Sequence, residues 1–294
     1  MAEPVTIGVL GPGAVGGALA VPLVQAGFDV VCIAREVTAE AISSQGLSLR
    51  HGSEEVTVQP RAVTELHEPV NLLLVTVKGP ALDDALGRIG SAASAVLPLL
   101  NGLEHVERIR RRLGGNVLAG SIGRLEAYRD GPTTVVQTTP APLITLFPAD
   151  GAAELLRSAR LDVRVGESEP AVLWEKLVRL APLAAATVIT QQTLGELRSD
   201  PDWRATLEAG VIEACEVAAA DGVQLDEAAQ WEILDTMPAT VTTSTARDAA
   251  AGRLNELDAI LGAVVRAARR TGLAAPTLEG LLADAEEACQ ARSH

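Results

Sequence analysis

The chain has 294 residues, of which 48% are hydrophobic, so it can build one large domain or two domains with separate cores. Its formal net charge of −14 opposes binding to phosphate backbones, and aromatic residues make up only 2% of the chain. Stacking surfaces for single-stranded nucleic acid are therefore scarce. We expect no nucleic-acid partner, and an anionic ligand would have to be held by local positive groups.

Cysteine usage and the N-terminal residues suggest a cellular setting. Cys32, Cys215 and Cys289 are widely spaced, fit no metal-binding or redox pattern, and are expected to be small core residues. Residues 1–4 carry no basic segment, and the apolar run after them is too short for a signal sequence or a membrane span. We therefore expect no metal site, no membrane partner and a cytoplasmic location.

Positive charge is distributed unusually, because the chain has 22 arginines and only two lysines, Lys78 and Lys176. Arginine stays protonated in proteins, whereas the pKa of a buried lysine can be lowered until the amine exchanges a proton near neutral pH. Codon bias would explain the count equally well. The positions of the two lysines therefore decide whether they are catalytic candidates or ordinary surface residues.

The first 34 residues have the order strand, glycine-rich turn, helix, strand. Apolar runs at 5–10 and 28–34 predict buried strands, and 18–26 predicts an apolar helix between them. The turn has the spacing Gly-x-Gly-x-x-Gly, which permits a tight bend and close approach of the backbone to a pyrophosphate at the helix N-terminus. This context predicts a dinucleotide site. Its candidate residues are Gly11, Pro12, Gly13, Ala14, Val15 and Gly16.

The end of the second strand indicates which dinucleotide binds. An NAD site usually has an acidic residue there for the ribose 2′-hydroxyl, but this chain has Arg35 after Ala34. A guanidinium can bind a 2′-phosphate through two hydrogen bonds, so we predict NADP(H). Glu36 would be a displaced acidic residue if the strand ended one residue later.

The rest of the N-terminal half continues the strand pattern. Residues 46–63 form a hairpin or a strand with its connection, and 71–77, 95–100 and 117–122 are buried strands. Residues 132–147 are expected to close the sheet, and 161–165 to add a last strand. Lys78 and Asn101 follow two of these strands, at the edge where open α/β sheets bind ligands. A surface charge and a simple turn are the alternative interpretations.

Beyond residue 169 the pattern is helical. We predict an α/β Rossmann domain over residues 1–167 and an all-α domain over 168–294. Lys176 lies on the apolar face of a helix over 173–190 that could break at Pro182, and desolvation there would lower its pKa toward neutrality. Such an amine suits a general acid, although a lysine that reaches solvent from a core helix has the same pattern.

Three later features complete the helical half. Asp200 and Asp226 are expected to cap helices that run to about residues 220 and 236. Glu256 precedes an apolar stripe over 257–268, where a helix N-terminus favours negative charge. Ser244 lies in a hydroxyl-rich stretch that forms either a cap or the lining of a polar pocket.

The ordered set of motifs resembles the ketopantoate reductase (2-dehydropantoate 2-reductase) family. The similar pieces run over nearly the whole chain in the family's order. They are GPGAVGG at 11–17, Arg35, VTVKG at 75–79, LLNGLEHVE at 99–107, WEKL at 174–177 and GRLNELDAILGAVV at 252–265.

The resemblance implies a Rossmann domain and a helical domain with the active site in the cleft between them. It implies reduction of a 2-oxo acid by NADPH in pantothenate biosynthesis, with Lys176 as proton donor. By resemblance, Lys78 and Asn101 contact cofactor and substrate, Ala127 and Glu256 contact the cofactor, and Ser244 binds the substrate.

The chain departs from the family at three positions. Leu180, Ala184 and Leu194 stand where the family commonly has asparagines that bind the polar end of ketopantoate. We therefore expect a 2-oxo acid with a less polar tail. The alternative functions are an imine or 3-hydroxy-acid reductase and a non-catalytic NADP(H)-binding regulator. For the oligomeric state, we expect a homodimer as one possibility.

Overall fold

The computed structural model describes residues 5–292, so the expectation drawn from residues 1–4 lies outside it. The chain divides into two compact units. Unit 1 comprises Met1–Leu100 and His105–Val172, and unit 2 comprises Asn101–Glu104 and Leu173–His294. The sequence analysis placed a single boundary at 167/168, and it did not indicate that residues 101–104 belong with the second unit.

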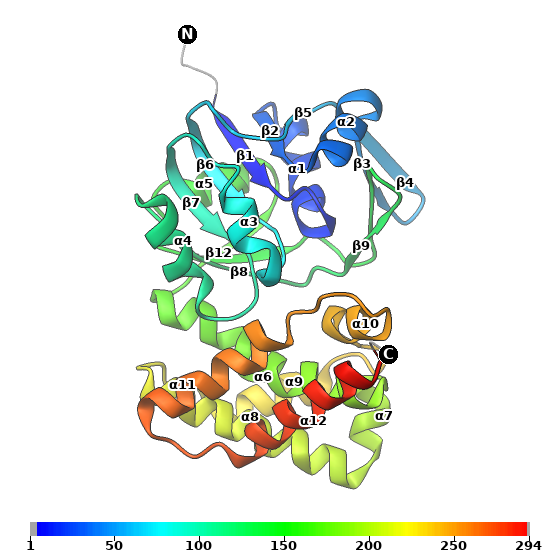
Figure 1. Cartoon of the computed structure of the whole chain (residues 1–294), viewed down its shortest axis with the longest axis vertical. Helices are drawn as coiled ribbons and strands as arrows, with labels where there is room; N and C mark the ends of the chain where they lie inside the picture. The colour runs from blue at the N-terminus through cyan, green and yellow to red at the C-terminus, as the bar shows by residue number, and fades with distance from the viewer. Residues whose placement is uncertain (1–4, 293–294) are drawn as a thin grey trace. The chain divides into compact units, whose positions relative to one another are not determined.

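Unit 1 is built on a parallel five-stranded sheet in the order β5-β2-β1-β6-β7, shown in Figure 1. The order reverses at β1, which pairs with β2 on one side and β6 on the other. Open α/β sheets generally bind ligands at the carboxyl ends of the strands beside such a reversal. The predicted Rossmann α/β class is confirmed. The strands are β1 Thr6–Leu10, β2 Asp29–Ile33, β5 Arg61–Val63, β6 Val70–Val75 and β7 Ala93–Pro98.

Helices connect these strands. The first, α1, begins at Ala14, inside the glycine-rich turn and four residues before the predicted start at Ala18. The glycines of this turn weaken the helical pattern in the sequence, although the backbone is already helical there. The helices of unit 1 are α1 Ala14–Gln25, α2 Glu36–Gln45, η1 Gly79–Ala81, α3 Leu82–Leu86, α4 His105–Leu113 and α5 Ala152–Ser158.

Strands of two further sheets lie in unit 1, so the expectation that residues 132–147 close the central sheet is wrong, whereas Val117 does pair with β7 through an isolated parallel bridge to Val96. One of these sheets has the order β4-β3-β10-β9, with β3 and β4 as a hairpin, and the other the order β12-β11-β8. Helix α1 is apolar on all sides, so the side that faces away from the central sheet also needs cover, and the four-stranded sheet provides it. The strands are β3 Leu47–His51, β4 Glu54–Val58, β8 Ala119–Gly123, β9 Ala127–Asp130, β10 Thr134–Gln137, β11 Leu143–Phe147 and β12 Asp162–Val165.

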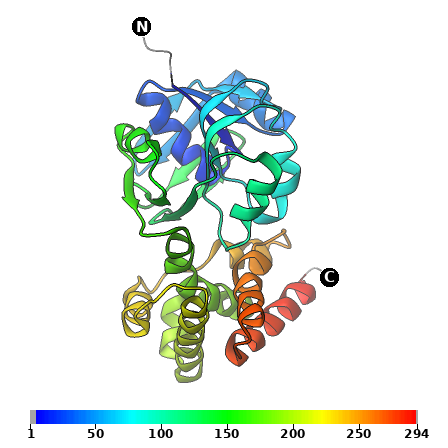
Figure 2. The ribbon, with the colours of Figure 1, turned by 90° about the vertical axis from the view of Figure 1, so that its left-hand side faces the viewer.

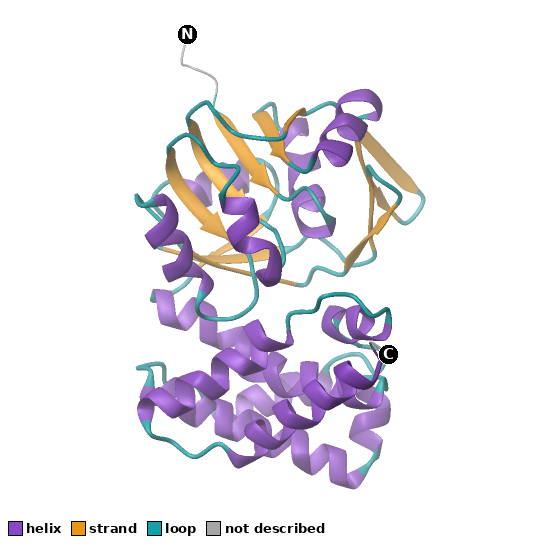
Figure 3. Cartoon of the chain, in the orientation of Figure 1, coloured by secondary structure: helices purple, strands orange, loops and turns teal. Residues whose placement is uncertain are grey.

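The described residues of unit 2 form helices joined by loops, with no strand among them, as Figure 2 and the colouring of Figure 3 show. Helix α8 packs against α7, α9, α11 and α12, and α6 continues through Pro182 without the expected break. The side chains of Asp200 and Asp226 cap α8 and α9 as predicted. The helices are α6 Glu169–Thr190, α7 Leu194–Ser199, α8 Pro201–Ala220, α9 Glu227–Thr236, α10 Ser244–Ala250, the π-helix η2 Asp258–Gly262, α11 Ala263–Thr271 and α12 Pro276–Arg292.

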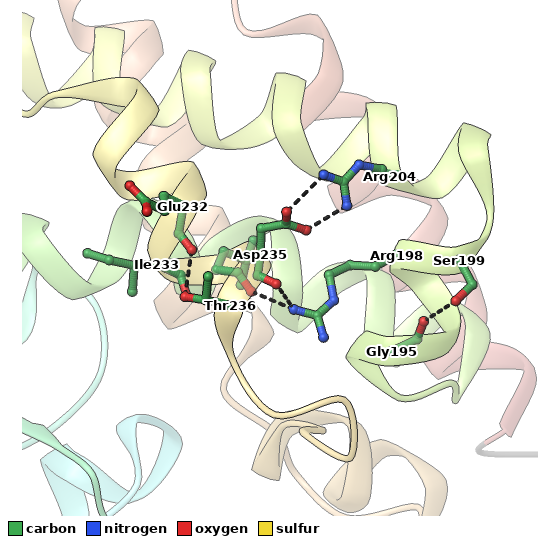
Figure 4. A network of polar contacts seen from close by, with 9 residues as sticks. Gly195, Arg198, Ser199, Arg204, Glu232, Ile233, Asp235 and Thr236 are labelled. Carbon is green, nitrogen blue, oxygen red and sulfur yellow. Dashed lines mark hydrogen bonds and ion pairs between the residues drawn. The ribbon is translucent and has the colours of Figure 1, made fainter.

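A polar network joins three helices of this unit (Figure 4). Arg204 of α8 donates two hydrogen bonds to Asp235 of α9, at 2.5 and 2.9 Å, and Arg198 of α7 donates to the Asp235 carbonyl oxygen. The hydrogen bond from Arg204 lowers the pKa of Asp235. The Arg204 guanidinium also lies 5.2 Å from the centre of the Trp231 ring. The network fixes how α9 packs on α7 and α8.

Residues 5–292 contain neither a membrane-spanning helix nor a cluster of metal ligands, and two of their three cysteines are buried. None of the helices there is long and apolar enough to cross a bilayer. That part of the chain also holds no group of three or more His, Cys, Asp or Glu residues arranged to bind a metal ion. Cys32 and Cys215 are buried as expected, and Cys289 is half-buried.

Candidate active site

The glycine-rich turn is held tightly against the end of β6. Thr76 Oγ1 donates hydrogen bonds to the carbonyl oxygens of Leu10 and Gly11, at 3.1 and 2.8 Å. A Cβ atom on Gly16 would lie 2.4 Å from the Gly11 oxygen and 2.5 Å from Thr76 Oγ1. Glycine is therefore required at position 16, because a side chain there would separate helix α1 from the strand.

The N-terminus of α1 fits a dinucleotide phosphate. Gly13, Ala14 and Val15 are partly exposed, and the first turn of the helix contains no acidic residue. The first N–H groups of a helix have no acceptor within the helix and lie at the positive end of its dipole. The residues present at 11–16 can therefore hold a pyrophosphate through backbone hydrogen bonds.

The first charged residue after β2 is an arginine, as the sequence indicated. Strand β2 ends at Ile33, and Arg35 is exposed at the N-cap of α2. Glu36 is already inside the first turn of that helix. The guanidinium is therefore the charged group nearer to the strand end.

The remaining candidates of unit 1 lie beyond strand ends or at an edge strand. Lys78 is exposed, follows β6 and precedes η1, and Ala127 is the half-buried first residue of β9. Their contacts with cofactor or substrate stay predictions. Asn101 also follows a strand of unit 1, namely β7, but it belongs to unit 2.

Within unit 2, three candidate residues from distant parts of the chain form one hydrogen-bonded group. Lys176 Nζ on α6 donates to Asn101 Oδ1 at 2.9 Å, and Asn101 Nδ2 donates to Glu256 Oε2 at 3.1 Å. Glu256 is only 7% exposed. The lysine can only donate and the carboxylate can only accept, so these two partners determine the orientation of the Asn101 amide.

The environment of Lys176 tunes its amine. Burial lowers the pKa of Lys176 from 10.5 to about 8. The negative charge of Glu256 opposes this shift, and the positive charge of Arg179, one turn further along α6, adds to it. An amine with this pKa is mostly protonated at pH 7 and can still release the proton, which is what general acid catalysis requires.

The loop that carries Asn101 is held on unit 2 by two features that sequence reasoning missed. Gly102 has φ +98°, and a Cβ atom there would lie 2.0 Å from the Ala259 carbonyl oxygen. Glu104 accepts two hydrogen bonds from Arg266, at 2.8 and 2.9 Å, and Arg266 also donates to Asp258 at 2.6 Å. The adjacent Asn-Gly pair was the available signal, but it predicted only a turn.

Helix α6 is anchored close to the lysine. The fully buried Trp174 donates from its indole nitrogen to Asp221 Oδ2 at 2.8 Å, which ties the start of α6 to the end of α8. Further along, the Oγ1 atoms of Thr187 and Thr243 are hydrogen-bonded at 2.8 Å. These contacts restrict rotation of the helix about its axis, and so they restrict the direction of the Lys176 side chain.

Ser244 and the three departing positions have different surroundings. Thr243 caps α10, and Ser244 is the exposed first residue of that helix. Within residues 5–292 no hydrogen bond joins Ser244 to Lys176, Asn101 or Glu256, so its substrate role stays a prediction. Among the departures from the family, Ala184 and Leu194 are completely buried, and Leu180 is the one with exposed surface.

The sequence resembles known proteins over most of its length. Residues 7–146 match the family described as "Ketopantoate reductase PanE/ApbA", and residues 171–286 match its "C terminal" counterpart. The 2-dehydropantoate 2-reductase of Mycobacterium tuberculosis is 31% identical over 295 residues, which covers 94% of this chain and 95% of that protein.

Solved structures show the same fold. A PanE/ApbA family ketopantoate reductase from Ralstonia eutropha superposes with a TM-score of 0.88 and 27% identity, covering 98% of this chain and all of the other. A D-mandelate dehydrogenase in complex with NADH and anilino(oxo)acetate gives a TM-score of 0.88 at 22% identity, with the same coverage. The second likeness concerns the fold alone.

Proposed function

This chain belongs to the ketopantoate reductase family of oxidoreductases, and we propose that it uses NADPH to reduce a 2-oxo acid to the 2-hydroxy acid. The observation that carries the proposal is the group of Lys176, Asn101 and Glu256, in which an amine with a pKa of about 8 has a fixed hydrogen-bond partner. Binding a dinucleotide alone would not require such an amine.

Most of the residues proposed to contact the cofactor belong to unit 1, whereas Asn101 and Glu256 belong to unit 2. We assign the pyrophosphate to the turn at 11–16 and the 2′-phosphate to Arg35, with Ala127, Lys78 and, from unit 2, Glu256 as further contacts. The reduced nicotinamide, when bound, supplies a hydride. NADPH rather than NADH is proposed because an exposed guanidinium stands where an NAD site presents a carboxylate.

The proton comes from Lys176. Its ammonium group donates to the substrate oxygen while the carbonyl carbon accepts the hydride, so the alcohol forms and the amine is left neutral until it takes a proton from water. Asn101 holds the amine through the 2.9 Å hydrogen bond, and Glu256 stabilises its charged form. Lys78, Asn101 and Ser244 are proposed to bind the substrate, with Ser244 on the carboxylate.

The substrate is proposed to be less polar than ketopantoate. Leu180 lies one turn after Lys176 on α6 and presents an apolar surface where the family commonly has an amide. The missing hydrogen bond is worth about 0.5–1.5 kcal/mol, or up to about tenfold in binding. A place in pantothenate biosynthesis follows only if ketopantoate itself is the substrate.

The test is an assay of the purified protein with NADPH and NADH against ketopantoate and 2-oxo acids with branched aliphatic or phenyl side chains. We expect NADPH oxidation with a preference for the apolar tails. Leu180→Asn should move the preference toward ketopantoate, whereas the matched control Leu180→Met should not. Exclusive turnover of ketopantoate contradicts the substrate assignment. Tight NADPH binding without turnover of any 2-oxo acid or imine contradicts catalysis.

A further inference from the structure

Arg129, which the glycine motif does not include, has its side chain on the α1 side of the four-stranded sheet. Strands β9 and β10 are antiparallel, and Arg129 lies directly opposite Val135, so the two side chains share a face. Val135 faces α1, because a Cβ atom on Gly17 would lie 2.5 Å from Val135 Cγ2. Tyr128 and Asp130, the neighbours of Arg129 in β9, lie on the opposite face.

This position is close to the N-terminus of α1. Gly17 is in the first turn of the helix, where its N–H donates to the Gly13 carbonyl oxygen at 2.8 Å. Strand β9 lies beside α1 (Figure 1). The Arg129 guanidinium donates to the Pro132 carbonyl oxygen, which anchors the side chain. The charge is thus held near the turn proposed to bind the dinucleotide phosphates.

Arg129 and Arg35 form an uncompensated pair of positive charges. Burial, and after it the charge of Arg35, lowers the pKa of Arg129, so the two side chains are near enough to repel each other. Across residues 5–292, neither of them is ion-paired with a carboxylate. Arg50, on the opposite face of the same sheet, is instead paired with Asp130 and Glu55. In a chain with a net charge of −14, two neighbouring unpaired arginines indicate an anion site.

We infer that Arg129 and Arg35 together bind the 2′-phosphate of NADP(H), and that Arg129 is a specificity-determining residue of this chain. The inference rests on the proposed function. A phosphate monoester offers three acceptor oxygens, so it can accept paired hydrogen bonds from two guanidinium groups and relieve their repulsion. NADH has a hydroxyl at that position and would leave the two positive charges facing each other.

The test measures dissociation constants of NADPH and NADH for the full chain by nucleotide fluorescence. Arg129→Met should weaken NADPH binding by about tenfold or more, as expected for loss of a charged hydrogen bond, and leave NADH binding unchanged. The control Arg50→Met changes an arginine on the other face of the sheet and should alter neither constant. In a double-mutant cycle with Arg35→Met the effects on NADPH should be non-additive, because both residues act on one phosphate.

The outcomes separate this inference from the proposal on which it rests. If the wild-type protein prefers NADPH but Arg129→Met keeps that preference, or loses both nucleotides equally, the role of Arg129 is overturned and that of Arg35 stands. If the wild-type protein does not prefer NADPH, the cofactor assignment fails as well. If Arg129→Met does not fold, Arg129→Lys replaces it, and a loss of at least about threefold in the NADPH preference is then required.

Discussion

Glu256 and Arg179 should move the pH dependence of the reaction in opposite directions. Glu256 raises the pKa of Lys176 and Arg179 lowers it. Glu256→Gln should therefore bring the pKa that governs kcat/KM below 8, and Arg179→Met should bring it above 8. Exposed residues of the same unit provide charge-matched controls, Glu287→Gln and Arg270→Met, which should leave it unchanged.

The magnitude follows from the environment of the amine. Lowering the pKa from 10.5 to about 8 corresponds to about 3 kcal/mol against the charged form. Removing one nearby charge should move the pKa by about one unit. At pH 7 the wild-type amine is then about nine-tenths protonated, and the Glu256→Gln amine about half protonated. Because the protonated form is the donor, the rate of reduction should be level at low pH and fall about tenfold per pH unit above the pKa.

The assay is initial-rate kinetics of NADPH oxidation from pH 6 to about pH 10, with a saturating nucleotide and a limiting 2-oxo acid. A direct reading is available as well, because the chain contains only two lysines. Protein labelled with ¹³C at the lysine ε-carbon gives two NMR signals, and Lys78→Arg assigns them. The reasoning is refuted if both variants shift the pKa in the same direction, or if the Lys176 signal titrates at the ordinary value of 10.5.

Three further changes test other parts of the structure. Lys176→Arg should lose most turnover and retain NADPH binding, since guanidinium does not release a proton near neutral pH; a near-normal kcat would remove the proton-transfer role. Gly102→Ala should lower kcat by about a hundredfold through displacement of Asn101; an unaltered kcat would contradict the positioning role of this loop. His105 is buried with both ring nitrogens unpartnered, and burial lowers its pKa from 6.5 to about 4. Below pH 6.5 this histidine therefore binds a proton in the unfolded chain but not in the folded chain. Its contribution to the free energy of unfolding is fully present above pH 6.5 and is lost as the pH falls toward 4. Urea unfolding should show a loss of about 2 kcal/mol in the free energy of unfolding between pH 7 and pH 5. His105→Leu should abolish this loss, and the control His67→Asn, at an exposed histidine, should not. An unchanged pH dependence in His105→Leu would refute the assignment to His105.

Several local features could be read directly from the sequence. The Gly-x-Gly-x-x-Gly turn, the caps at Asp200 and Asp226 and the position of Arg35 after a buried strand are all encoded within a few neighbouring residues. Turn geometry, capping and hydrophobic periodicity depend on residues close in the chain, which is why these elements were predictable. The choice of Lys176 as proton donor also came from the sequence, through the motifs that resemble the family.

Other features depend on which distant segments pack together. Strands β8, β10 and β11 have the composition of buried strands, but the need to cover the outer side of α1 decides which sheet β10 joins. The assignment of residues 101–104 to unit 2 depends on the fit of Gly102 against Ala259 and on the pairing of Glu104 with Arg266. These contacts span more than 150 residues of sequence, so no local pattern records them.

The sequence by itself identified Lys176, Asn101 and Glu256 as candidate site residues. Only the tertiary structure decided that an amide at position 101 connects the amine to the carboxylate, and that Arg129 lies on the same side of its sheet as helix α1. The physical reason is that desolvation, charge proximity and hydrogen-bond geometry are properties of three-dimensional neighbours. A chain specifies those neighbours only through the packing of its whole fold.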